Sequence, residues 1–105
     1  MNLPKVLSNL IAAQNKHDSA AYVQCFSETA IVFDEGKTHQ GSVEIQQWIA
    51  KANEEYKVTV TPLEYDALEK IMLAEVSGTF PGSPIVLKYH FEFANDQISS
   101  LRIVG

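Results

Sequence analysis

The sequence has few basic residues, and this excludes a large class of partners. Only eight of its 105 residues are Lys or Arg, against 13 Asp or Glu, which gives a formal net charge of −5. The eight cations are spread singly along the chain, so no basic patch is available to neutralise a phosphate backbone. We therefore expect no nucleic-acid partner.

Long apolar runs and paired cysteines are also missing. No run is long enough for a transmembrane helix, and the first five residues lack the apolar core of a signal peptide, so we expect no membrane partner and a cytoplasmic protein. The single cysteine, Cys25, excludes an internal disulfide. Its neighbours Tyr22, Val23 and Phe26 favour a small buried hydrophobe over a nucleophile, because no His or Lys stands one helical turn away to lower its thiol pKa.

Metal-ligand spacing is absent too. The three histidines, His17, His39 and His90, are widely scattered and form neither an HxH nor an HExxH pattern. We expect no metal and no other cofactor. What is present is an ordinary supply of core residues, 46% hydrophobic with 10% aromatic, in a length that suits one domain spanning residues 1–105.

Helical periodicity dominates the first half of the chain. Apolar residues recur at helical spacing from Leu3 to Ile11, with Gln14 on the same face, and predict a helix over about residues 4–16. Asp18 suits the N-cap of a short second helix whose apolar face runs from Ala21 to Phe26. Ser42 suits the start of a third helix that ends near residue 56.

Alternating apolar and polar residues predict strands before and after the third helix. A first strand covers residues 30–33 and is followed by a loop over 36–41; further strands cover about 57–65, 70–80, 85–93 and 98–104. In the strand 85–93 the odd residues Ile85, Leu87, Tyr89, Phe91 and Phe93 share one face, which we expect to be a core face, with His90 on the other. The pattern predicts an α+β domain with the helices on one side of an antiparallel sheet.

The most informative stretch runs the apolar segment 30–33 directly into Asp34, Glu35 and Gly36. Burial beside apolar groups disfavours a charged carboxylate and raises its pKa, which makes this a candidate site for a general base. The alternative is a solvated turn, since these residue types are common where a strand ends. A shift of one residue at the strand end would exchange Asp34 with Glu35.

Several segments together resemble one superfamily. The stretch Ile11-Ala12-Ala13-Gln14-Asn15-Lys16-His17-Asp18, the later Phe26-Ser27-Glu28-Thr29-Ala30-Ile31-Val32, and Gly41, Ile45 and Trp48 are similar to the nuclear-transport-factor-2-like superfamily, closest to its SnoaL-like branch. The resemblance implies a cone-shaped α+β roll, with three N-terminal helices packed in the concave face of a curved antiparallel or mixed sheet. It also implies an apolar pocket that holds a small hydrophobic molecule.

The resemblance suggests roles for three residues. Asp34 resembles the general base of ketosteroid isomerases, which takes a proton from the carbon next to a carbonyl. The two donors that hold the enolate oxygen there would fall at about Leu10, which cannot donate a hydrogen bond, and Tyr89, which can. His39 lies in the same loop as Asp34 and could pair with Asp34 or Glu35 as an auxiliary group.

Aromatic residues are the candidates for the pocket lining, although aromatics at such spacing more often fill a core. They are Tyr22, Phe26, Trp48, Tyr56, Phe80 and Phe91. The outer sheet face, with Leu73, Thr79, Val86 and His90, is apolar enough to predict a homodimer. Two functions stay open: a proton-transfer isomerase, cyclase or dehydratase, and a non-catalytic ligand-binding or dimerisation module.

Overall fold

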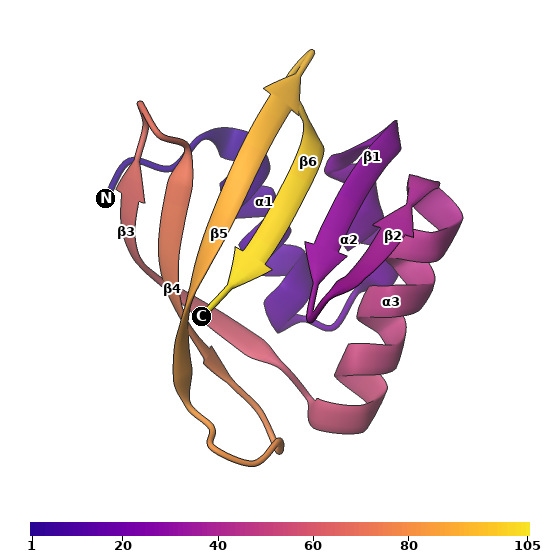
Figure 1. The fold of residues 1–105 in the computed structure, drawn as a ribbon, viewed down its shortest axis with the longest axis vertical. Helices are drawn as coiled ribbons and strands as arrows, with labels where there is room; N and C mark the ends of the chain where they lie inside the picture. Colours follow the sequence, from indigo (N-terminus) through magenta and orange to yellow (C-terminus); the bar gives the residue numbers. More distant parts are fainter.

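The computed structural model describes residues 1–105 and places three helices on one face of a six-stranded sheet (Figure 1). The helices are α1 (Lys5–Asn15), α2 (Ser19–Gln24) and α3 (Gly41–Tyr56). The strands are β1 (Phe26–Asp34), β2 (Lys37–Gln40), β3 (Thr59–Asp66), β4 (Ile71–Ser77), β5 (Ile85–Ala94) and β6 (Gln97–Val104). The predicted α+β fold, with all helices on one side of the sheet, is confirmed. None of the helices combines the length and apolar character needed to cross a membrane.

The sheet is open and mixed, in the order β2-β1-β6-β5-β4-β3. Strands β3 to β6 form the antiparallel meander that the alternation predicts. The first strand joins it by parallel pairing of β1 with β6, which the periodicity did not predict. This pairing brings the end of β1 into the middle of the sheet, beside the end of β6.

The expected loop over residues 36–41 is wrong, because Lys37–Gln40 pairs with β1 as strand β2. The cause is the turn between them, in which Glu35 and Gly36 have φ angles of 51° and 74°. Two consecutive residues at positive φ suit the tight two-residue turns that match the twist of a hairpin. The turn sets the register in which His39 lies opposite Val32.

The helix ends follow local hydrogen bonding. Asp18 caps α2 as predicted and accepts a hydrogen bond from the backbone N–H of Ala21 at 3.0 Å. Phe26 is not on α2, since β1 begins at that residue. Ser42 does not cap α3; instead Glu44 in its first turn accepts a hydrogen bond from the Gln40 N–H at 2.9 Å.

The core lies between the helices and the concave face of the sheet. On β5 the side chains of Tyr89 and Phe91 point into it, and His90 lies between them on the outer face, where its cross-strand neighbours are Ile71 and Arg102. Ile85 departs from the prediction, because 38% of it is exposed. It stands at the end of the β4–β5 hairpin, which projects past the rest of the sheet (Figure 1).

Candidate functional site

Asp34 is the carboxylate that faces the interior. It ends β1 on the same side as the fully buried Ala30 and Val32, and it is itself half-buried. Glu35 begins the turn and is exposed. The alternation of β1 therefore separates two adjacent carboxylates into different environments.

The Asp34 carboxylate is held by the indole of Trp48. Helix α3 packs across β1, and the Trp48 Nε1–H donates a hydrogen bond to Asp34 Oδ2 at 3.3 Å. Burial raises the pKa of Asp34, and the negative charge of Glu35 raises it further, while the Trp48 hydrogen bond and His39 lower it. The net effect is a carboxyl pKa above its ordinary value.

The His39 ring packs against the indole that holds Asp34. Its half-buried ring stacks on Trp48, with ring centroids 5.4 Å apart and an interplanar angle of 25°. No hydrogen bond or ion pair joins His39 to Asp34 or Glu35, and the hairpin register sets Lys37 opposite Asp34 and His39 opposite Val32. The imidazole nevertheless lies close enough for its positive charge to lower the pKa of Asp34.

Two buried tyrosines stand near Asp34. Tyr22 on α2 meets Trp48 edge-on, with ring centroids 6.2 Å apart. Tyr89 comes from strand β5 of the sheet. Burial raises the pKa of both phenols; the charge of Asp34 adds to the shift at Tyr89, and Tyr89, Cys25 and Asp34 add to it at Tyr22. Both hydroxyls therefore stay protonated at neutral pH and are able to donate hydrogen bonds.

The other predicted lining residues separate into two groups. Phe26 and Phe91 are 3% and 2% exposed and fill the core. Tyr56 and Phe80 meet edge-on, 6.2 Å between centroids, and join the end of α3 to the β4–β5 hairpin, where the Thr79 N–H also donates to the Tyr56 carbonyl. The structure thus brings together Asp34, His39, Trp48, Tyr22 and Tyr89. Phe26 packs against Tyr22 and Phe91 stacks on Tyr89, with ring centroids 5.5 and 6.2 Å apart, whereas Tyr56 and Phe80 form a separate pair.

The interior leaves little free space. A cavity of about 10 Å³ lies between the helices and the sheet, and its lining is Leu10, Ile11, Gln14, Tyr22, Val60, Met72 and Tyr89. Gln14 is the residue that sequence reasoning missed as a member of this region. The available signal was its place on the apolar face of the first helix, where a polar residue needs partners inside the protein.

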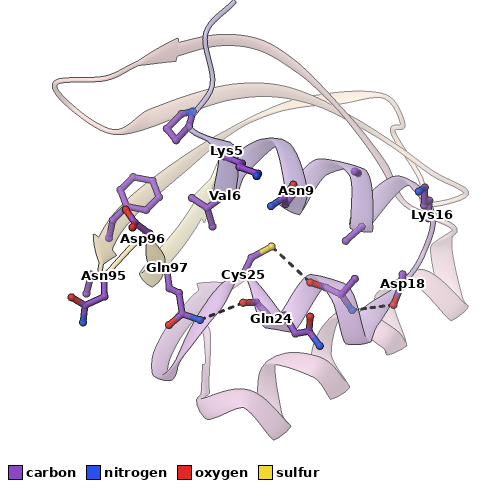
Figure 2. A pocket seen from close by; sticks show the side chains of 16 residues that line it. Lys5, Val6, Asn9, Lys16, Asp18, Gln24, Cys25, Asn95, Asp96 and Gln97 are labelled. Atoms are coloured by element: carbon purple, nitrogen blue, oxygen red, sulfur yellow. Dashed lines mark hydrogen bonds between the residues drawn. The ribbon is translucent and has the colours of Figure 1, made fainter.

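A larger open groove of about 1110 Å³ lies on another side of the molecule, between α1, α2 and the β5–β6 turn (Figure 2). Its lining includes charges of both signs: Lys5 begins α1, Lys16 and Asp18 lie between α1 and α2, and Asp96 lies in the β5–β6 turn. The Cys25 thiol is buried in its wall and bonds to the Ala21 carbonyl at 3.7 Å, and burial raises the thiol pKa. Neither Asp34 nor either of the two interior tyrosines lines this groove.

Comparison with known proteins gives the family through structure. No protein-family model and no curated protein matches the sequence. Among solved structures, a Sinorhizobium meliloti protein with the provisional description of polyketide cyclase is 36% identical, with 97% of this chain and 95% of that chain covered and a TM-score of 0.90. The chain therefore belongs to the nuclear-transport-factor-2-like superfamily, in its SnoaL-like, polyketide-cyclase-like branch.

More distant structures share the fold alone. A Catenulispora acidiphila protein with a ketosteroid isomerase-like fold, in complex with trimethylamine, is 20% identical over 99% of this chain and 87% of that chain, with a TM-score of 0.86. A computationally designed binder of 17-OHP is 11% identical over 95% of this chain and 90% of that chain, with a TM-score of 0.79. The fold is one that holds small ligands in these neighbours.

Proposed function

We propose that this protein binds a small hydrophobic molecule between its helices and the concave sheet face, and that Asp34 acts there as a general base. The reaction is a proton transfer of the kind found in isomerases, cyclases and dehydratases. The observation that carries the proposal is the inward-facing, half-buried Asp34 carboxylate, whose pKa is raised by burial. Such a carboxylate is a stronger base than a solvated one at the pH where both are ionised.

The surrounding groups fit the two halves of a proton transfer. Asp34 takes a proton from the carbon next to a carbonyl, and the electron pair of that C–H bond moves toward the carbonyl oxygen. A buried, protonated phenol such as Tyr89 donates a hydrogen bond to the oxygen as negative charge develops. The Asp34 carboxyl then returns the proton to a carbon of the enolate, and the new C–H bond gives the product. His39, whose ring stacks on Trp48, adjusts the basicity of Asp34 as an auxiliary group.

Exchange of carbon-bound hydrogen tests this role without knowledge of the natural substrate. 2-Tetralone in deuterated buffer exchanges its α-hydrogens slowly, and proton NMR follows the loss of their signal. We expect the protein to accelerate this exchange, Asp34→Asn to return it to the buffer rate, and the matched control Glu35→Gln to keep it. Equal acceleration by the protein and by Asp34→Asn would remove Asp34 from the mechanism.

A second candidate is a non-catalytic ligand-binding or dimerisation module of the same fold. The observation that favours the dimerisation module is the interior cavity of about 10 Å³, which is far below the several hundred Å³ of a typical small-molecule site. Binding of any ring-sized molecule then requires side chains of the core to move apart.

The outer sheet face supports the dimer that this candidate calls for. Val86 on β5 and Phe33 on β1 are 49% and 40% exposed there, with the half-buried Ile71 and Leu73 on β4. The charged Lys88, Glu92 and Arg102 share this face, and apolar residues among charges suit a symmetric interface with a second copy. We therefore propose a homodimer through this face.

Sedimentation tests the dimer. Val86→Lys places a charge on the outer face and should shift the protein from dimer to monomer mass. The control Val43→Lys changes a residue that is 69% exposed on α3, away from the sheet face, and should leave the mass unchanged. A monomer mass for the unsubstituted protein, or a dimer that persists in Val86→Lys, would count against this interface.

A further inference from the structure

The interior cavity has the size of one small polar group. Its volume of about 10 Å³ is close to the minimum that holds a single water molecule. Four of its lining side chains are apolar, namely Leu10, Ile11, Val60 and Met72. The other three, Gln14, Tyr22 and Tyr89, carry polar groups and line this space from α1, α2 and β5.

The hydrogen bonds of Gln14 fix which of its atoms is left over. The residue is 4% exposed, and its Nε2 donates to Asn53 Oδ1 and to the Val58 carbonyl, both at 2.8 Å. The Val58 oxygen is only an acceptor, so the amide nitrogen must point toward it and cannot be exchanged with the oxygen. Gln14 Oε1 therefore remains an acceptor to which no protein group donates.

The hydroxyls of Tyr22 and Tyr89 also lack a partner in the protein. Tyr22 and Tyr89 are 3% and 6% exposed, and neither hydroxyl takes part in a hydrogen bond with another protein group. Yet the protein has no fully buried side-chain nitrogen or oxygen without a partner. The three oxygen atoms must therefore border accessible space, and the cavity is the space that their side chains share.

We propose that Gln14, Tyr22 and Tyr89 form a binding site for one neutral hydroxyl group. A hydroxyl accepts a hydrogen bond from a phenol and donates its own hydrogen to Gln14 Oε1, so it satisfies both kinds of group at once. A carbonyl oxygen can accept from Tyr89, as in the proposed reaction, but it has no hydrogen for Gln14 Oε1 and leaves that acceptor unpaired. An ammonium group would bring a charge among apolar walls with no carboxylate in the lining.

Two kinds of molecule can supply the hydroxyl group. In the free protein it belongs to a water molecule, which fits the cavity volume. In a complex it belongs to an alcohol or phenol of the ligand, and core side chains move apart to admit the ligand's body. The ligand half of this inference rests on the proposed function, whereas the site itself does not depend on any reaction.

A high-resolution crystal structure of the free protein tests the site directly. We expect one ordered oxygen within hydrogen-bond distance of Gln14 Oε1 and both phenol oxygens. An interior with no such oxygen, in which the three side chains bond to one another, would overturn the proposal. This result is independent of the 2-tetralone exchange, so the failure of one test is distinguishable from the failure of the other.

Matched naphthalenes test the ligand source. 2-Naphthol can donate and accept, whereas 2-methoxynaphthalene can only accept. We expect 2-naphthol to displace the ordered water and to bind about tenfold or more tightly than its methyl ether, because the ether leaves a buried acceptor unpaired. A water that stays in place with 2-naphthol present, or equal binding of the two probes, would overturn the ligand half.

Variants assign the preference to this site. Tyr89→Phe and Tyr22→Phe remove one hydroxyl each without changing the ring, and each should reduce the preference for 2-naphthol over its ether. Tyr65→Phe is the control, because Tyr65 is half-buried on β3 but does not line the cavity. A preference that both cavity variants retain in full would locate the recognition of the hydroxyl elsewhere.

Discussion

Replacement of Gln14 by Met measures how much the buried polar contacts of α1 stabilise the fold. Met has nearly the length of Gln but cannot donate to Asn53 Oδ1 or to the Val58 carbonyl, which now accept at 2.8 Å. A buried group left unpaired costs about 1–3 kcal/mol. The Val58 oxygen keeps a second contact, with His17 Nε2 at 2.8 Å. The loss of the Gln14 donor therefore costs less at Val58 than at Asn53. We expect a total loss of roughly 2–3 kcal/mol in the free energy of unfolding.

Urea unfolding followed by circular dichroism gives this loss. With a slope of about 1–1.5 kcal/mol per molar urea for a chain of this size, the midpoint should fall by roughly 2 M. The control is Gln47→Met on the exposed face of α3, which should change the stability by no more than about 0.5 kcal/mol. About 1 kcal/mol is the least that a buried unpaired group costs. A smaller loss in the free energy of unfolding of Gln14→Met would show that these two hydrogen bonds do not stabilise the fold.

Three further predictions concern other parts of the chain. In Gly78→Ala the new Cβ would lie 2.6 Å from the Tyr56 carbonyl and 3.0 Å from the Phe80 ring, so urea unfolding should show a loss of about 1–3 kcal/mol; an unchanged midpoint would contradict this contact. Because the pKa of Asp34 is raised in the fold, its contribution to stability is present at low pH and lost as pH rises through the folded pKa. Asp34→Asn should therefore unfold at a higher temperature than the parent at pH 7, with the gap closing in acid. The reverse order at pH 7 would show that the fold favours the charged carboxylate, which contradicts a raised pKa. The Cys25 thiol, buried and with a raised pKa, should react with a disulfide reagent only after urea is added, and rapid labelling of the native protein would be inconsistent with its place in the structure.

The elements that bury one face were predictable from the sequence. The helical spacing around Leu7 and Leu10 and the alternation around Tyr89 and Phe91 reflect faces that the structure buries. Strand β2 carries no such pattern, since three of its four residues are exposed and it owes its pairing to the turn at Glu35 and Gly36. The parallel β1–β6 pairing joins segments about 70 residues apart in the sequence. Local periodicity indicates where strands lie but not which strands pair with each other.

The candidate site was predictable as a position but not as an arrangement. The apolar strand before Asp34 indicated a carboxylate beside the core, and the structure supplies the side on which it lies. The Trp48 hydrogen bond depends on how α3 crosses β1, and the place of His39 depends on the hairpin register. The cavity is set by the packing of seven side chains from five elements, so its volume and its polar lining follow only from the assembled fold.

Asp34 is an inward-facing carboxyl whose pKa is raised by burial. Carbon-13 NMR of the aspartate carboxyl carbons, titrated with pH and assigned with Asp34→Asn, measures this value directly. The account predicts a pKa above the ordinary aspartate value of about 3.9, and a further rise in Trp48→Phe, which removes the hydrogen bond that stabilises the charged form. A pKa at or below the ordinary value, unchanged in Trp48→Phe, would mean that Asp34 is a solvated turn residue and that the proposed base is wrong.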